Sequence, residues 1–189
     1  MSETAKTRQI SICVYCGSRF GENPAYKTAA TELGQTLAQQ NWRLVYGAGD
    51  VGLMGAVANG AQNAGGETFG VIPQHLLKWE VGKRDLSQFI ITENMHERKK
   101  VMYMNSDAIV VLPGGAGSLD ELFEVLTWRQ LGLHEKPVFL LNIEGYWQPL
   151  IDLLEHVIKQ GFADENLRSY FQVVDTVDDF ATALRDALS

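Results

Sequence analysis

One stretch of this chain brings together residue types that could hold an anion and act on it. Val111–Leu126 reads VLPGGAGSLDELFEVL, so three glycines, a serine and a glutamate stand where an apolar strand meets an amphipathic helix. Ser118 and Glu121 have the spacing of a capping box, in which each side chain satisfies a free amide at a helix start. The alternative is an anion site, because a phosphate needs several backbone amides with no side chains in the way.

The glycines decide between these two explanations. Thr176 and Asp179 have a similar spacing before another predicted helix and no glycines precede them, so a cap alone does not indicate a ligand. A cap does not need the PGGAG that precedes Ser118. We therefore favour an anion site formed by the amides of Gly115, Ala116, Gly117 and Ser118, although glycines also serve plain turns.

The rest of the chain predicts the elements that position this stretch. Short apolar runs alternate with helical stretches, a pattern typical of an α/β fold with a mostly parallel sheet and helices on both faces. The apolar runs are QISICVY, WRLVYG, ETFGVIP, FIIT, DAIVVLPG, PVFLLN and FQVVD. The predicted helices are Pro24–Gln40, Gly52–Ala64, Met95–Asn105, Ser118–Leu131, Tyr146–Gln160 and Asp178–Leu188. We expect residues 1–189 to form a single domain, with residues 1–8 flexible.

Ligands of such sheets bind at the carboxyl ends of the strands. Three loops of small residues stand at predicted strand ends: Cys16–Arg19, which contains Gly17 and Ser18, then Tyr46–Gly55, and the stretch with Gly114 and Gly115. Three such loops at one edge predict a crevice for a ligand the size of a nucleotide.

Composition excludes several classes of partner. Lys and Arg number 16 against 23 Asp and Glu, and the net charge of −7 disfavours nucleic acid or an acidic membrane. The N-terminus MSETAKTRQI is polar and no apolar run is long enough for a membrane helix, so we expect a cytoplasmic protein. An anionic ligand then requires a locally basic pocket.

Sequence patterns for other chemistries do not fit their context. Cys13 and Cys16 form a C-x-x-C, but they fall in or after a predicted strand instead of at a helix start, so we do not expect a redox site. Gly47, Gly49 and Gly52 match G-x-G-x-x-G, yet they follow the second strand, and Glu67 lies at the wrong end of the third for a ribose contact. The sequence has no Walker loop or nucleophile elbow, and its scattered histidines disfavour a zinc site, so we expect no metal and no cofactor.

A charged cluster, HERKK, begins the predicted helix at Met95. A solvated helix face explains such a run as well as a site does. Positive charge in a first helical turn is unfavourable, so Arg98 and Lys99 need an anion or a carboxylate nearby. If this helix leads into DAIVVL, we expect its start at the opposite edge of the sheet from PGGAG, unless the preceding loop folds back.

With MHERK and PGGAGSLDE both present, the chain resembles the "lonely guy" family of cytokinin riboside 5′-monophosphate phosphoribohydrolases, which older descriptions often call lysine decarboxylases. The resemblance runs from about Ile10 to Gly161. It implies a Rossmann-like fold, usually a homodimer, that hydrolyses N6-substituted AMP, and often AMP itself, to free base and ribose 5-phosphate without a cofactor. No recognised pyridoxal phosphate motif supports lysine decarboxylation.

By position in the motifs, the resemblance implies that Arg98 and Glu121 are catalytic. It implies phosphate binding by Gly114, Gly115, Gly117 and Ser118, and further substrate contacts by Glu80, Lys99 and Thr127. Three departures from the family pattern, Ala48, Ser118 and Asp120, remove no charged group that the chemistry requires.

Two other functions stay open at this point. One is a general nucleoside 5′-monophosphate glycosidase with another base preference. The other is a nucleotide-binding or carrier protein without catalysis, although the presence of both Arg98 and Glu121 favours an enzyme.

Overall fold

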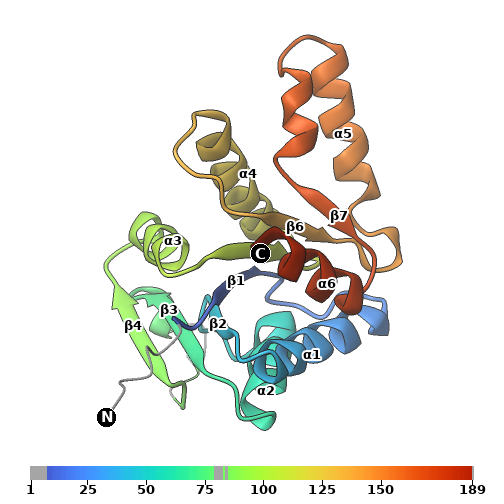
Figure 1. Cartoon of the computed structure of the whole chain (residues 1–189). Coiled ribbons are helices and arrows are strands. Elements are labelled where there is room, and N and C mark those ends of the chain that lie inside the picture. The colour runs from blue at the N-terminus through green and yellow to red at the C-terminus, as the bar shows by residue number, and fades with distance from the viewer. Residues whose placement is uncertain (1–7, 79–82, 84, 189) are drawn as a thin grey trace, which may run out of the picture.

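The computed structural model describes residues 8–78, 83 and 85–188, and in them seven strands form one parallel sheet (Figure 1). The order across the sheet is β4-β3-β2-β1-β5-β6-β7, and every neighbouring pair is parallel. The strands are β1 (Ser11–Tyr15), β2 (Arg43–Tyr46), β3 (Thr68–Pro73), β4 (Gln88–Thr92), β5 (Ala108–Val111), β6 (Val138–Leu141) and β7 (Gln172–Val174).

Helices cover both faces of this sheet. One apolar core packs α1, α2 and α6 against the first face, and a second packs α3, α4 and α5 against the other, in agreement with Figure 1. The helices are α1 (Pro24–Gln39), α2 (Gly52–Asn63), α3 (Met95–Met104), α4 (Ala116–Gln130), α5 (Gln148–Lys159) and α6 (Val177–Leu188). Three short 3-10 helices are η1 (Leu76–Lys78), η2 (Ile143–Gly145) and η3 (Glu165–Ser169).

The order of the strands locates the ligand-binding edge. The chain builds outward from β1 to β4, then returns through α3 to place β5 on the other side of β1. The connections after β1 and β5 therefore run to opposite sides of the sheet, and in such sheets ligands bind in the crevice between the carboxyl ends of these two strands.

The α/β class, the seven strands and the six helices confirm the sequence predictions. Residues 1–7 lie outside the described residues, and Arg8, which we expected to be flexible, forms an ion pair with Asp107 at 2.6 Å. Among the described residues, no helix combines the length and the apolar character needed to cross a membrane.

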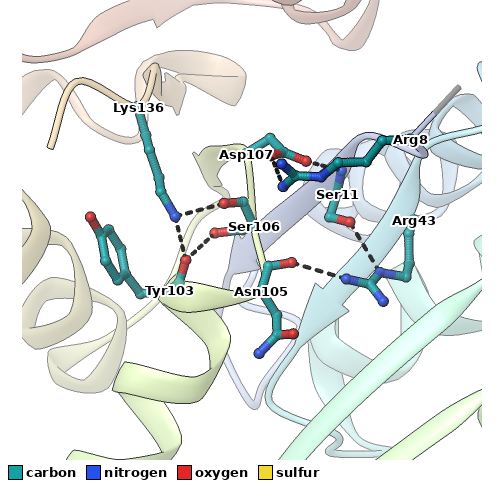
Figure 2. Close-up of polar contacts among 8 residues, drawn as sticks. All are labelled: Arg8, Ser11, Arg43, Tyr103, Asn105, Ser106, Asp107 and Lys136. Carbon is teal, nitrogen blue, oxygen red and sulfur yellow. Dashed lines mark hydrogen bonds and ion pairs between the residues drawn. The ribbon is translucent and has the colours of Figure 1, made fainter.

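The carboxyl end of α3 is anchored at the amino edge of the sheet, as Figure 2 shows. Lys136 donates hydrogen bonds to the carbonyl oxygens of Tyr103 and Ser106, each at 2.6 Å, and Arg43 donates one to that of Asn105 at 3.2 Å. These carbonyls belong to the last turn of α3 and to its exit, where helical partners are missing and cations are favoured. The two cations therefore fix the position of α3 against the sheet.

The contact between α1 and α2 depends on two glycines. A Cβ on Gly34 would collide with the carbonyl oxygen of Val57, and one on Gly60 would collide with that of Thr31. The absence of both side chains lets the two helix backbones approach closely.

We expect Gly34→Ala to lower the stability by about 1–3 kcal/mol, because the added methyl forces α1 and α2 apart. Thermal and urea unfolding measure this loss. Gln35→Ala, at an exposed position one residue further along α1, is the control and should stay within about 0.5 kcal/mol of the wild type. Equal stability of the two variants would contradict the assigned role of Gly34.

Candidate active site

A cavity of about 550 Å³ opens at the carboxyl edge of the sheet. Residues that follow β1, β2, β5 and β6 line it, together with parts of α1, α2, α3 and the start of α4. This is the place where the strand connections diverge, and the volume is in the range of small-molecule sites.

The glycine-rich stretch supplies free backbone amides to this cavity. We call residues 113–118 the anion loop; all six residues line the cavity. Helix α4 begins at Ala116 after Gly115, and no side chain caps it, so the amides of its first turn lack helical partners. A Cβ on Gly115 or Gly117 would meet no atom within 4 Å. The loop therefore presents amides and the positive end of a helix dipole to open space, as an anion site requires.

The capping box that the spacing of Ser118 and Glu121 offered as the alternative explanation does not form. Helix α4 begins two residues earlier than expected, with Gly115 in extended conformation as its N-cap, so Ser118 lies within the first turn. Ser118 is buried, and its hydroxyl occupies the space that a side chain on Gly114 would need. Glu121 is therefore not used as a cap and lines the cavity instead.

The second capping signal is confirmed. The Asp179 amide donates a hydrogen bond to the Thr176 hydroxyl at 3.1 Å, and that hydroxyl donates one to the Asp179 carboxylate at 2.6 Å. The two similar sequence signals thus have different outcomes, because Gly115 takes the N-cap position before Ser118 can.

Helix α3 begins at the same edge as the anion loop, so the expectation that it starts at the opposite edge is wrong. Strand β4 runs parallel to β3, and α3 follows β4 directly. A helix that connects two parallel strands begins where the first strand ends, and this carries Arg98 into the cavity lining together with Glu121.

Arg98 is only 6% exposed and is held by the sheet. Its Nε donates a hydrogen bond to the carbonyl oxygen of Val71 at 3.1 Å, and Nη2 donates one to that of Gly47 at 2.8 Å. A Cβ on Gly47 would collide with the guanidinium. The first glycine of the apparent dinucleotide pattern therefore makes room for Arg98.

Glu121 is half-buried, and burial raises its pKa to about 7. The positive charges of Arg98 and Lys99 lower this pKa, whereas the carboxylates of Asp120 and Glu124 raise it. A carboxyl group with this pKa exists in both protonation states near neutral pH, which suits a group that accepts and returns a proton.

Lys99 and Thr127 do not line the cavity. Lys99 is buried and forms ion pairs with Asp120 at 2.9 Å and Glu124 at 3.0 Å, both on α4. These pairs supply the carboxylates that a cation near the start of α3 needs. Because Arg98 and Lys99 are both buried, a solvated helix face does not describe either residue. Thr127 is exposed on α4. The predicted contact Glu80 lies outside the described residues.

The loop after β1 meets the anion loop as predicted. Gly17 and Ser18 both line the cavity, and the Gly17 amide donates a hydrogen bond to the carbonyl oxygen of Pro113 at 3.0 Å. Arg19, in the same loop, also lines the cavity and is exposed. The net charge requires a basic pocket. Arg19 was not among the predicted site residues, although it ends the Cys16–Arg19 loop at a predicted strand end.

Tyr146 was missed for another reason. It follows β6 closely and lines the cavity, and its hydroxyl donates a hydrogen bond to the carbonyl oxygen of Gly114 at 2.6 Å. Tyr146 was predicted to start a helix, but α5 begins two residues later, at Gln148.

The expected absence of a redox motif agrees with the location of the two cysteines. Cys13 lies in β1 and Cys16 directly after it, both are buried, and burial raises the pKa of both thiols. Within residues 8–78, 83 and 85–188, no group of three or more His, Cys, Asp or Glu residues could hold a metal ion.

Most of this chain is similar in sequence to known proteins. A family model described as "Possible lysine decarboxylase" matches residues 54–184. The probable cytokinin riboside 5′-monophosphate phosphoribohydrolase LOG4 of Oryza sativa subsp. japonica is 42% identical over 177 residues, which cover 94% of this chain and 77% of that protein. The cytokinin riboside 5′-monophosphate phosphoribohydrolase LOG5 of Arabidopsis thaliana is 42% identical over 169 residues, with 89% of this chain and 74% of that protein covered.

Among solved structures, the molybdenum cofactor (Moco) carrier protein of Chlamydomonas reinhardtii has a similar fold. The TM-score is 0.72 at 24% identity, and the match covers 96% of this chain and 98% of that chain. At this identity the similarity extends to the fold alone.

The raised pKa of Glu121 predicts a stability change that needs no substrate. Between about pH 4.5 and 7 the folded state keeps a proton that the unfolded state releases, so the wild type loses stability as the pH rises. Glu121→Gln cannot lose this proton. We expect it to be more stable than the wild type by on the order of 2 kcal/mol at pH 8 and nearly equal at pH 4.5. Melting temperatures across this range test it, and a constant difference would show that Glu121 titrates normally.

Proposed function

Because this chain belongs to the family of cytokinin riboside 5′-monophosphate phosphoribohydrolases, we propose that it hydrolyses the N-glycosidic bond of N6-modified adenosine 5′-monophosphates, and of AMP. The products are the free base and ribose 5-phosphate. The observation that carries this proposal is the pairing, in one cavity, of the anion loop with the carboxyl group of Glu121, whose pKa burial raises to about 7.

The 5′-phosphate binds at the anion loop in this proposal. The amides of Gly115 to Ser118 donate hydrogen bonds to it, and the open space beside Gly115 and Gly117 admits its oxygens. Gly114 allows the loop to pack on Ser118, and Gly17 and Ser18 form the facing wall. Arg19 adds positive charge to the cavity of a chain whose net charge is −7.

The base binds against the apolar part of the cavity lining. Leu53, Met54, Leu76 and Met95 belong to this lining, and flexible methionine side chains adapt to substituents of different shape. This surface suits an adenine ring with an apolar N6 substituent better than a charged ligand.

Glu121 performs the acid–base chemistry. Cleavage of an N-glycoside passes through an oxocarbenium-like sugar, which a nearby carboxylate stabilises. Water adds its oxygen to C1′ as the bond from C1′ to the purine nitrogen breaks. Glu121 accepts the proton that the water loses and passes it toward the departing base, so no external acid, oxidant or cofactor is consumed.

Arg98 acts electrostatically, because its guanidinium stays protonated. Two of its donors are occupied by the carbonyls of Gly47 and Val71, which hold the cation in one orientation beside the cavity. A fixed charge of this kind favours the ionised form of Glu121 and stabilises negative charge that develops in the reaction without reorganising.

The description attached to the family model names a different reaction, lysine decarboxylation. A glycine-rich anion loop beside a carboxyl group of raised pKa fits a nucleotide better than an amino acid. From the sequence, we further propose that residues 1–189 form a single nucleotide-binding hydrolase domain and that the protein is located in the cytoplasm.

We predict that the purified protein releases base from AMP or from N6-isopentenyl-AMP, and that Glu121→Gln lowers kcat by at least about 100-fold, since it loses the proton acceptor. Arg98→Lys should lower kcat by on the order of 10- to 100-fold, because lysine keeps the charge but lacks the planar guanidinium that bonds both carbonyls in one orientation. Chromatography of base and of ribose 5-phosphate follows the reaction, and melting temperatures show that the variants are folded.

The controls separate the alternative functions. Faster release from an unmodified nucleotide than from the N6-modified one would indicate a general nucleoside 5′-monophosphate glycosidase. Tight binding of AMP without release of any base would indicate a carrier protein and overturn the hydrolase assignment. Glu155→Gln, on α5 outside the cavity, removes a carboxylate that pairs with Arg168 and should leave kcat unchanged.

We also propose a homodimer, formed through the face that carries α3 and α4. An apolar groove of about 430 Å³ lies there, lined among others by Tyr103, Met104, Trp128 and Leu133. Met104 and Leu133 are each 65% exposed, which is costly unless a second surface covers them. Glu124, which pairs with Lys99, also lines this groove.

The doubly substituted Met104→Glu and Leu133→Glu protein should be a monomer in light scattering at concentrations where the wild type is a dimer, because two buried carboxylates at the interface remain unpaired. Phe162→Glu replaces a residue that is 86% exposed outside this groove and should leave the dimer intact. If the wild type is a monomer at about 100 μM, where an interface with a micromolar dissociation constant would be formed, the proposed dimer is contradicted.

A further inference from the structure

Tyr146 contacts the anion loop from the next strand of the sheet. It follows η2, a tight turn in which Glu144 and Gly145 have left-handed backbone conformations, with φ of 53° and 71°. This turn brings the Tyr146 hydroxyl to the carbonyl oxygen of Gly114, to which it donates a hydrogen bond at 2.6 Å. Tyr146 therefore reaches the loop itself, while its ring lines the cavity.

The ring of Tyr146 is held on two sides. It packs edge to face on Tyr26 of α1, with the ring centroids 5.4 Å apart, and on Trp147 at 4.8 Å. Trp147 is buried, and its indole nitrogen donates a hydrogen bond to the carbonyl oxygen of Val111 at 3.2 Å. Val111 ends β5. Trp147 therefore bonds the strand that leads into the anion loop, and Tyr146 bonds the loop itself.

The peptide that Tyr146 contacts is otherwise easily reoriented. It joins Gly114 to Gly115, and neither residue has a side chain that restricts rotation of the peptide plane. In a planar trans peptide the carbonyl oxygen and the amide hydrogen point in opposite directions. A flip of this peptide would therefore exchange the Gly115 amide for the Gly114 oxygen, and an anion at the loop would meet a negative dipole in place of a donor.

We propose that Tyr146 is a positioning residue that locks the Gly114–Gly115 peptide in the orientation that binds phosphate. The hydroxyl accounts for the lock, because it fixes the Gly114 oxygen and with it the direction of the Gly115 amide. This inference rests on the proposed function, since it states which residue keeps the same anion loop able to bind a 5′-phosphate.

Tyr146→Phe removes only the hydroxyl and keeps the ring between Tyr26 and Trp147. We expect it to weaken binding of inorganic phosphate and of ribose 5-phosphate by about 2- to 10-fold, the range for one lost hydrogen bond. Binding of adenine, which has no phosphate, should stay unchanged. The KM for AMP should rise by the same factor as the phosphate dissociation constant, with a smaller effect on kcat.

Isothermal titration with inorganic phosphate and adenine measures the binding, and the amide resonance of Gly115 in a labelled sample reports the orientation of the peptide. Tyr170→Phe is the control, because it removes a tyrosine hydroxyl that lies outside the cavity. It should leave phosphate binding, KM and kcat at wild-type values.

Equal phosphate affinity of Tyr146→Phe and the wild type would overturn the inference, as would an equal loss of phosphate and adenine binding, which indicates general loosening. A wild type that binds no phosphate would overturn it together with the anion loop. If the wild type releases no base from any nucleotide but phosphate binding still depends on the hydroxyl, the hydrolase proposal fails, and the role of Tyr146 in phosphate binding is supported.

Discussion

The candidate site depends on the burial of one permanently charged group. Arg98 lies where β2 and β3 end, and the sheet supplies two carbonyl oxygens that partly replace the water lost by its guanidinium. The cation could not occupy this place if residue 47 had a side chain. Because β4 runs parallel to β3, α3 begins at the carboxyl edge and brings Arg98 to these carbonyl oxygens, where its fixed positive charge lowers the pKa of Glu121.

This arrangement also has a cost in the stability of the folded protein. A carboxyl group whose pKa is raised by burial is less stable when ionised than the same group in water. The ion pairs of Lys99 with Asp120 and Glu124 tie α3 to α4, and Lys136 and Arg43 hold the other end of α3. The two helices that carry Arg98 and Glu121 are thus fixed against each other and against the sheet, which offsets the cost of bringing their charges into a cavity.

Much of the fold could be predicted from the sequence, because apolar runs and helical periods are local signals. The seven strands and the six helices were predicted in this way, and the glycine run separately placed residues 113–118 at the end of a strand. The predicted start of α4 at Ser118 was two residues late, since the spacing of Ser118 and Glu121 does not reveal that Gly115 already takes the N-cap position. The edge at which α3 begins was also wrong, because it depends on the direction of β4 in the sheet. Tyr146 was missed because its contact with Gly114 joins residues that are distant in sequence.

The position of β1 in the middle of the sheet has a consequence for folding. Its pairing with β5 joins Ile12 to Ala108, so it closes a loop that contains β2, β3, β4 and three helices. Contacts of such long sequence separation form slowly, because the chain loses much entropy before they are made. Since the loops after β1 and β5 make the two walls of the cavity, the site is complete only when this late pairing has formed. Recovery of phosphate binding during refolding therefore reports the closure of the whole sheet, whereas helix formation can be detected earlier.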